Sequence, residues 1–267
     1  MTLAFGTDRP VIGMVHLSPL PGAPAFDGDR EAVRDGMVRD AKRLESGGVD
    51  GLIVENFGDA PFYADDVPKH VVASMTALVD DLTRAVDLPV GVNVLRNDAE
   101  AALSVAAATD ASFVRVNVHI GARLTDQGIV TGAAPETVRL RDRLDTDVSI
   151  LADVAVKHSA ALAARPLEEA VTELVGRGQA DGIVASGAGT GQETDRAHLE
   201  AVVAARDELE STIPVFVGSG VTSDTVADML ALSDGVIVGT ALKEGGDTTA
   251  PVDEARVRDL VAAARPD

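Results

Sequence analysis

Cysteine is absent from the 267 residues of this chain. The absence excludes a thiol nucleophile and a thiolate metal site, and it is typical of proteins from the cytosol. No stretch approaches the ~18 uninterrupted apolar residues of a membrane-spanning helix. The N-terminus, MTLAFGTDRP, lacks the basic region and apolar run of a signal peptide. We therefore expect a soluble, unprocessed, cytoplasmic protein with no membrane insertion.

Lysine is scarce, with only Lys42, Lys69, Lys157 and Lys243, and 43 acidic residues against 23 basic ones give a formal charge of −20. Such a surface repels nucleic acid and anionic lipid at long range. The acidic residues are scattered and form no tail. Their abundance favours an origin in a salt-loving organism, with an ordinary acidic cytosolic protein as the alternative. A local site must hold any anionic ligand against this field, in salt that screens the repulsion.

No Pro/Gly/Ser-rich linker divides the chain, so we expect a single domain over residues 1–267. Short, almost continuous apolar runs alternate with helical patterns, as in a buried parallel sheet. Eight runs of this kind are predicted strands: Val11 to Leu17, Leu52 to Glu55, Val90 to Val94, Phe113 to Val116, Val148 to Ala152, Gly182 to Ala185, Val215 to Val217 and Val236 to Val238.

Eight β/α units in a chain of this length favour a (β/α)₈ TIM barrel of the phosphate-binding type over an open doubly wound sheet. In such a barrel the loops that follow the strands form the functional face. Three of these loops are long, at residues 18–29, 56–68 and 118–134. The last contains three glycines, as a mobile lid would, and we hypothesise that it places Arg123 over the ligand.

Glycine-rich turns follow the last two predicted strands, in VFVGSGVTSDT and GVIVGTALKEG. Backbone N–H groups of such turns bind phosphate in many barrels, because glycine lets the backbone approach closely. We expect phosphate binding by these turns and by the first glycine of the loop after the sixth strand; the residues are Gly218, Ser219, Gly220, Gly239, Thr240 and Gly187. The alternative is that the glycines simply end strands.

The loop after the sixth predicted strand reads ASGAGTG and superficially resembles a dinucleotide-binding loop. Gln192 occupies the place of the third glycine, and no first-unit βαβ context exists, which argues against such a cofactor site. We expect this loop to close the site beside the phosphate, with Ser186 and Thr190 as ligand contacts.

Polar side chains lie at the ends of the first five predicted strands, which barrel geometry brings around one mouth. As catalytic residues we predict Lys157, Asp153, Glu55 and His16, and as further substrate contacts Asn93, Arg115, Asn117 and His158. Lys157 is suited to neutralise an anion, act as a base or form a Schiff base, unless it merely pairs with Asp153. Arg115 is suited to grip a carboxylate or a second phosphate.

A metal is a less favoured reading. Glu55, Asp153, His16 and His158 offer oxygen and nitrogen ligands, but no HxxxH-type cluster fixes them. We therefore predict no cofactor and no metal ligand, with a divalent ion as the alternative. His70 and His198, which lie in helical stretches, are expected at the surface.

Seven segments in order resemble the BtpA family, which includes SgcQ-like proteins: GMVHLSPLPGAP, VENFGDAPFY, GVNVLRNDAEAAL, FVRVNVHIGARLTDQGIVTG, ADVAVKHS, ASGAGTG and VGSGVTSDTVADML. The resemblance covers residues 11–261 and implies a phosphate-binding barrel. The family's name comes from a role in building up photosystem I, while SgcQ-like members lie beside sugar-utilisation functions. The resemblance implies no catalytic mechanism.

These observations leave three functions open. The first is an isomerase or lyase acting on a phosphorylated sugar or related metabolite. Phosphoribosylanthranilate isomerase is a specific version, but that enzyme is expected to use a cysteine base, which this chain lacks. The second is a non-catalytic assembly or regulatory factor, which predicts an exposed apolar or uncharged patch. The third is a nucleoside or nucleotide hydrolase that uses Asp153 or Glu55 to activate water. A homo-oligomer is compatible with all three.

Overall fold

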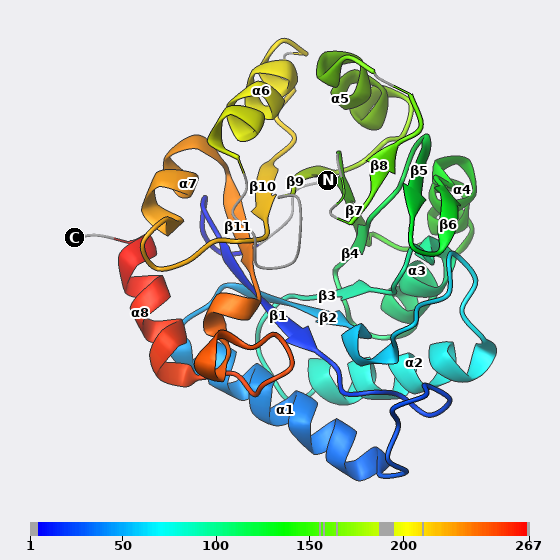
Figure 1. Ribbon diagram of the computed structural model, residues 1–267, viewed down its shortest axis with the longest axis vertical. Coiled ribbons are helices and arrows are strands. Elements are labelled where there is room, and N and C mark those ends of the chain that lie inside the picture. Colours follow the sequence, from blue (N-terminus) through cyan, green and yellow to red (C-terminus); the bar gives the residue numbers. More distant parts are fainter. Residues whose placement is uncertain are drawn as a thin grey trace.

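Eight parallel strands close into a barrel in the computed structural model (Figure 1). The structure describes residues 5–154, 156, 158–163, 165–186, 195–209 and 211–265. The strands are β1 (Val11–His16), β2 (Gly51–Glu55), β3 (Val90–Asn93), β4 (Phe113–Val116), β7 (Ser149–Asp153), β9 (Gly182–Ala185), β10 (Val215–Gly218) and β11 (Gly235–Val238). They match the eight predicted apolar runs to within one or two residues. The (β/α)₈ fold is therefore confirmed.

Helices surround the barrel and cover the outer side of its strands (Figure 1). They are α1 (Arg30–Gly47), α2 (Lys69–Thr83), α3 (Ala99–Ala108), α4 (Ala134–Arg143), α5 (Leu167–Gly176), α6 (Arg196–Asp207), α7 (Val226–Leu232) and α8 (Glu254–Ala264), with short 3₁₀ turns η1 (Phe57–Asp59), η2 (Thr240–Leu242) and η3 (Glu244–Gly246). Asp29, Asp98, Asp195 and Asp253 cap four of the helices through their side chains. Across the described ranges, no helix is long and apolar enough to cross a membrane.

The barrel interior is filled by alternate residues of the strands, which form one buried apolar cluster. Phe5 belongs to this cluster. Its ring centroid lies 5.5 Å from that of Phe113 and 6.1 Å from that of Phe216, and both contacts are edge to face. Gly91 makes room for Phe113, because a Cβ at Gly91 would lie 2.2 Å from the Phe113 ring. Apolar side chains thus seal the barrel below its mouth.

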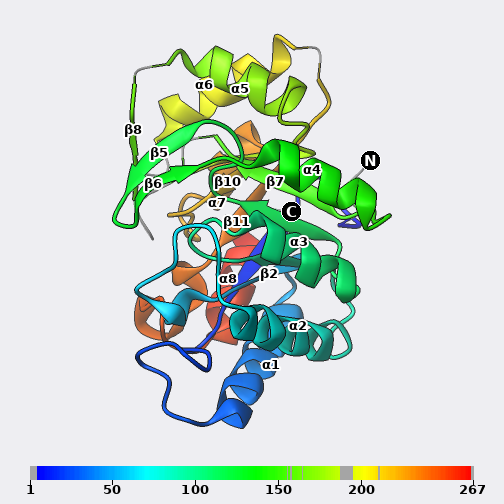
Figure 2. The same cartoon turned by 90° about the vertical axis from the view of Figure 1, so that its right-hand side faces the viewer.

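The long segment after β4, which we predicted as a mobile lid, contains regular secondary structure. It forms an antiparallel hairpin of β5 (Ala122–Thr125) and β6 (Gly128–Thr131), joined on its other side by β8 (Ala160–Ala161). The turn closes at Gly128, whose φ of 100° suits glycine. Figure 2 shows β5, β6 and β8 together along one flank of the molecule, near α4. We call these three strands the flank sheet.

Candidate active site

At the carboxyl ends of the barrel strands, the inward-facing positions carry polar side chains instead of apolar ones. The register pairs His16 of β1 with Glu55 of β2, and Glu55 with Asn93 of β3. Glu55 is 3% exposed; its Oε2 accepts a hydrogen bond of 2.6 Å from Nδ2 of Asn93. Its Oε1 lies 3.9 Å from Nε2 of His16. The structure therefore brings these three predicted residues into one row, with a carboxylate at its centre.

Arg115 and Asp153 form a buried ion pair beside this row. Nε and Nη2 of Arg115 donate to the two carboxylate oxygens of Asp153 at 2.9 and 2.8 Å. Ser186 Oγ and Asn117 Nδ2 also donate to Asp153. Burial acts to lower the pKa of Arg115, but the charge and hydrogen bonds of Asp153 raise it overall.

Two sequence-based roles change with this pair. We predicted a bidentate contact between Arg115 and a ligand, but the structure shows this bidentate contact between Arg115 and Asp153. Asp153 accepts hydrogen bonds from three different side chains, so both of its carboxylate oxygens are already engaged. Glu55 is the better placed carboxylate for proton transfer, because a single amide holds one of its oxygens.

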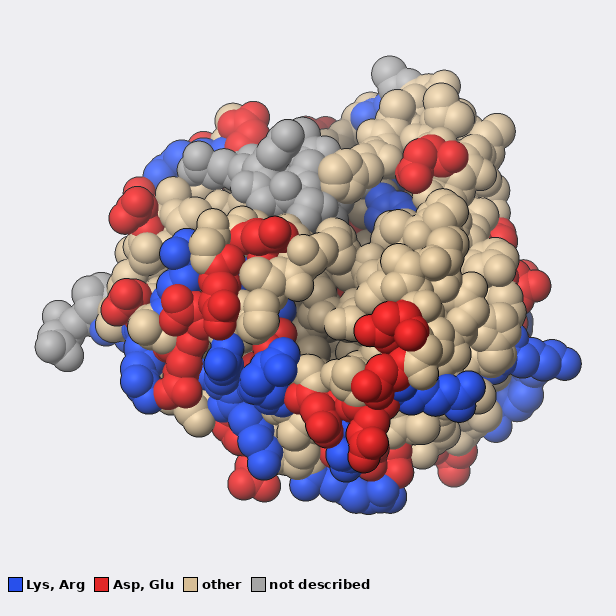
Figure 3. Space-filling view, turned by 60° about the horizontal axis from the view of Figure 1, so that its bottom comes forward, with Lys and Arg blue, Asp and Glu red and all other residues tan. Residues whose placement is uncertain are grey.

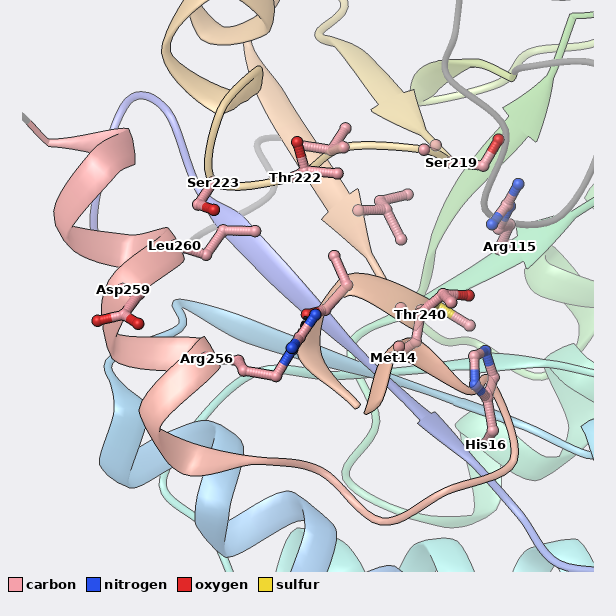
Figure 4. A pocket seen from close by; sticks show the side chains of 17 residues that line it. Met14, His16, Arg115, Ser219, Thr222, Ser223, Thr240, Arg256, Asp259 and Leu260 are labelled. Carbon is pink, nitrogen blue, oxygen red and sulfur yellow. Dashed lines mark hydrogen bonds between the residues drawn. The ribbon is translucent and has the colours of Figure 1, made fainter. Parts of the chain in front are cut away.

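A cavity of about 400 Å³ lies between the turns after β10 and β11. It is lined by the five described residues of the predicted phosphate cradle, Gly218, Ser219, Gly220, Gly239 and Thr240. Figure 4 shows these turns facing one another, with Arg115 beside Ser219 and His16 near Thr240. We call this space the phosphate cavity. In Figure 3 the molecule is hollowed near the centre of the face, with charged side chains gathered below the hollow.

The two turns require glycine for a steric reason. A Cβ at Gly218 would lie 2.5 Å from Cγ1 of Val184 and 3.4 Å from Nη2 of Arg115. A Cβ at Gly239 would lie 3.0 Å from Cε1 of His16. Ser219 between them has a φ of 152°, in a region that side chains seldom occupy. The glycines therefore let Arg115 and His16 form the floor of the phosphate cavity.

Sequence reasoning missed several residues that line the phosphate cavity, among them the polar residues Thr222, Ser223, Arg256 and Asp259. Thr222 and Ser223 follow the first glycine turn in VGSGVTSDT, so their position was a usable signal. Arg256 comes from α8 and donates through Nε to the carbonyl of Ala241 at 2.9 Å. No local pattern reveals Arg256, because only the closed barrel brings α8 beside the turn after β11.

Arg96, outside that cavity, is a further residue that the sequence did not reveal. It follows β3 and is 6% exposed. Its backbone N–H donates to the carbonyl of Tyr63 at 2.9 Å, and the preceding N–H, of Leu95, donates to Oδ1 of Asn56 at 2.7 Å. Burial lowers the pKa of its guanidinium, while the charges of Asp153 and Glu55 oppose that shift. A buried cation thus lies within electrostatic reach of both carboxylates.

The remaining predicted residues are spread differently. Lys157, Gly187 and Thr190 lie outside the described residues. His158 is exposed on the segment after β7, with a φ of 54°, and does not line the phosphate cavity. His70 is exposed and His198 is half-buried. Within the described ranges, no three or more His, Asp or Glu side chains are arranged to hold a metal ion.

Comparisons with known proteins agree on a family and on the fold. The model of the BtpA family matches residues 7–266. A photosystem I biogenesis protein BtpA of Synechocystis is 45% identical, with 97% of this chain and 89% of that protein covered. The putative sgc region protein SgcQ of Escherichia coli is 31% identical, with 96% of this chain and 94% of that protein covered. Neither match supports an origin in a salt-loving organism.

Solved structures share the barrel at low sequence identity. Tryptophan synthase of Mycobacterium tuberculosis has a TM-score of 0.62 at 19% identity, covering 97% of this chain and 94% of that chain. N-(5'-phosphoribosyl)anthranilate isomerase of Pyrococcus furiosus has a TM-score of 0.57 at 13% identity, covering 96% of this chain and 98% of that chain. These similarities establish the architecture.

Proposed function

This chain belongs to the BtpA family, and we propose that it is an enzyme acting on a phosphorylated sugar or a related phosphorylated metabolite. The observation that carries the proposal is the phosphate cavity, built from two glycine turns over a floor of His16 and Arg115. It adjoins a row of acid–base side chains centred on Glu55. The solved isomerase from Pyrococcus furiosus is named after a phosphoribosyl compound, and this name supports the same ligand class.

Phosphate binding follows from the groups that line the phosphate cavity. Among the described residues, no hydrogen bond engages the backbone N–H groups of Gly220 and Val221. Thr222 and Thr240, whose side chains carry hydroxyl groups, line the same space. Each hydrogen bond to a charged phosphate contributes about 1.5 to 3 kcal/mol, so three or four suffice to anchor it without a lysine.

Arg256 supplies the positive charge at the rim. Within the described part of the chain, no carboxylate lies within 4.0 Å of its guanidinium. The charge of Arg115, in contrast, is already balanced by Asp153. Arg256 therefore offsets the repulsion that a chain of charge −20 exerts on an anion.

Glu55 and His16 are the proposed acid–base pair. Nδ1 of His16 donates to the carbonyl of Thr248 at 3.2 Å, which turns Nε2 toward Glu55. Asn93 fixes the other oxygen of Glu55. Such a pair suits the removal of a proton from a carbon beside a carbonyl and its return to a neighbouring atom, as in isomerisation, or the proton transfers of aldol cleavage. The isomerase and lyase classes both remain within the proposal.

Thermal melting with phosphorylated sugars tests binding. Glucose 6-phosphate, ribose 5-phosphate and their unphosphorylated parents are compared at equal concentration. A ligand at 100 times its Kd stabilises the fold by about 2.7 kcal/mol, or roughly 5 to 10 °C in Tm for a chain of this size. Only the phosphorylated members of a pair are expected to raise Tm. Equal shifts with the parent sugars, or none with any phosphorylated sugar, contradict the proposal.

The variant Glu55→Gln tests chemistry separately from binding. It keeps the shape and the contact with Asn93 but removes the proton acceptor. We expect ligand affinity within about threefold of wild type and a loss of about 100-fold or more in exchange of ligand carbon-bound hydrogen with D₂O, followed by NMR. Unchanged exchange in the variant would remove Glu55 from the mechanism.

An assembly role is the second candidate, and one observation favours it. Three apolar side chains of the flank sheet region are exposed: Leu124 at 49%, Ile129 at 60% and Leu162 at 53%. Leu124 and Ile129 are cross-strand partners and therefore share a face. A relative bears the name of a photosystem I biogenesis protein. If Glu55→Gln restored function in a Synechocystis strain lacking that relative while L124S/I129S/L162S failed, the assembly role would prevail.

The proposal includes two statements about the protein's surroundings. It places the protein in the cytoplasm, where phosphorylated sugars are made and consumed. It names the phosphorylated small molecule as the partner and excludes nucleic acid, because a net charge of −20 repels a polyanion. Sedimentation would reveal whether the protein is also a homo-oligomer.

A further inference from the structure

A second cavity of about 340 Å³ lies between the flank sheet and α5. It is lined at its inner end by Asn117 and Asp153, at its rim by Arg123 and Arg165, and elsewhere mainly by apolar side chains. We call it the sheet cavity. Asp153 also accepts the bond from Arg115, which lines the phosphate cavity, at 2.8 Å. Each cavity is therefore lined by one partner of the same ion pair.

Asn117 offers an unused acceptor at the inner end of the sheet cavity. The residue is 2% exposed, and its Nδ2 donates to Asp153 at 3.3 Å. This contact fixes the orientation of the amide, because the flipped amide would place an oxygen against the carboxylate. Among the described residues, nothing donates to its Oδ1. A buried acceptor of this kind favours a ligand that carries an O–H or N–H donor.

Arg123 places a cation at the rim of the sheet cavity. It is half-buried, and its guanidinium is held by the hydroxyl and the carbonyl of Ser159. In the described part of the chain, no carboxylate lies within 4.0 Å of it. Arg165 at the same rim pairs with Glu173 at 2.8 Å. Burial lowers the pKa of Arg123, as expected for a desolvated cation.

We propose that the sheet cavity holds the far end of the substrate, which carries a second acidic group bound by Arg123 and a hydroxyl or N–H group bound by Oδ1 of Asn117. This inference rests on the proposed function, in which the phosphate cavity holds the first anion. The substrate class is then narrower: a phosphate ester whose opposite end is a carboxylate or a second phosphate. Arg115 and Asp153 lie beneath the middle of that ligand.

Two matched ligand pairs test the second acidic group. 6-Phosphogluconate and glucitol 6-phosphate differ at one end, where a carboxylate replaces a hydroxymethyl group. 3-Phosphoglycerate and glycerol 3-phosphate form a shorter pair with the same difference. Titration calorimetry on the full chain is expected to show at least a tenfold preference for the acid in one of the pairs, the range that one charge-assisted contact provides.

Variants assign the preference to a residue. Arg123→Gln is expected to reduce the preference to less than about twofold while the Kd of the neutral member stays unchanged. Arg123→Lys retains the charge and is expected to keep most of the preference, which separates binding from a role in folding the flank sheet. Arg165→Gln is the control, because Arg165 shares the rim but is already paired.

The outcomes separate the two proposals. If both members of each pair bind equally to wild type, the sheet cavity does not hold an acidic group, and the phosphate cavity is unaffected. A preference that survives Arg123→Gln also overturns the inference. If no ligand of either pair binds, and inorganic phosphate does not bind either, the proposed function itself fails.

Discussion

Replacing Asp153 with asparagine perturbs the most buried ion pair of the barrel mouth. The side chain of Asp153 is 0% exposed and that of Arg115 is 3% exposed. Asparagine preserves the shape but removes the charge, and it can place an NH₂ group against the donors of Arg115 and Ser186. The guanidinium then remains buried without its counter-charge.

Removing one partner of a buried ion pair destabilises a protein by about 3 to 5 kcal/mol. For a chain of this size, 1 kcal/mol corresponds to about 2 to 4 °C in Tm, so we expect a drop of roughly 6 to 20 °C. Urea unfolding followed by far-ultraviolet circular dichroism measures the free energy of unfolding, and calorimetry measures Tm. Phosphate-ester affinity should fall as well, because Arg115 forms part of the floor of the phosphate cavity.

The pair formed by Arg165 and Glu173 is the matched control. Its nitrogen-to-oxygen distance is also 2.8 Å, but its side chains are 40% and 37% exposed. Because water screens an exposed pair, Glu173→Gln should leave Tm almost unchanged. A loss of less than about 1 kcal/mol in Asp153→Asn would refute the reasoning, since it would show that the pair is solvated or that Glu55 replaces the missing charge.

Three further predictions follow from other contacts. Gly239→Ala should weaken phosphate-ester binding about tenfold in calorimetry, because the added Cβ lies 3.0 Å from Cε1 of His16. His119→Gln should flatten the fall in unfolding free energy below about pH 6.5, by at most about 1.4 kcal/mol per pH unit. Burial lowers the pKa of His119, so the unfolded state takes up its proton first as pH falls and stability is lost down to the folded-state pKa. Lys243→Met should cost about 3 to 5 kcal/mol in urea unfolding, because Asp40, 3.1 Å away, loses its buried partner.

Controls separate these effects from general damage. Gly176→Ala adds a Cβ with no atom within 4 Å and should leave binding unchanged. His70→Gln removes an exposed histidine. In that background, the effect of His119→Gln on the pH dependence of the unfolding free energy should be unchanged. A double variant, D40L/K243M, should recover much of the lost stability. Equal losses of unfolding free energy in Lys243→Met and in D40L/K243M would show that lost packing, and not an unpaired charge, destabilises the variants.

The strands could be predicted because parallel barrel strands are buried on both sides and read as apolar runs. The same alternation places His16, Glu55 and Asn93 at one level, so their convergence could also be predicted. Sequence order does not show which polar groups satisfy one another. Arg115 was assigned to a ligand because its partner, Asp153, lies on another strand, and its contact depends on the three-dimensional register.

The flank sheet shows a different limit. Residues 122–131 contain two four-residue strands, and β8 contributes only Ala160 and Ala161. Strands this short give little periodicity, and the pairing with β8 joins segments distant in sequence. The burial of Arg96 could not be predicted for a related reason, since it depends on how the chain turns after β3. Single residues in irregular segments carry no pattern of their own.

Because β1 pairs with β11, the barrel can close only late in the synthesis of the chain. The phosphate cavity takes Met14 and His16 from the first strand and Arg256 and Leu260 from the last helix. A nascent chain on the ribosome therefore lacks part of the lining of this cavity until α8 has been synthesised. Under the proposed function, ligand binds only the closed barrel, and its binding energy is then added to that of barrel closure.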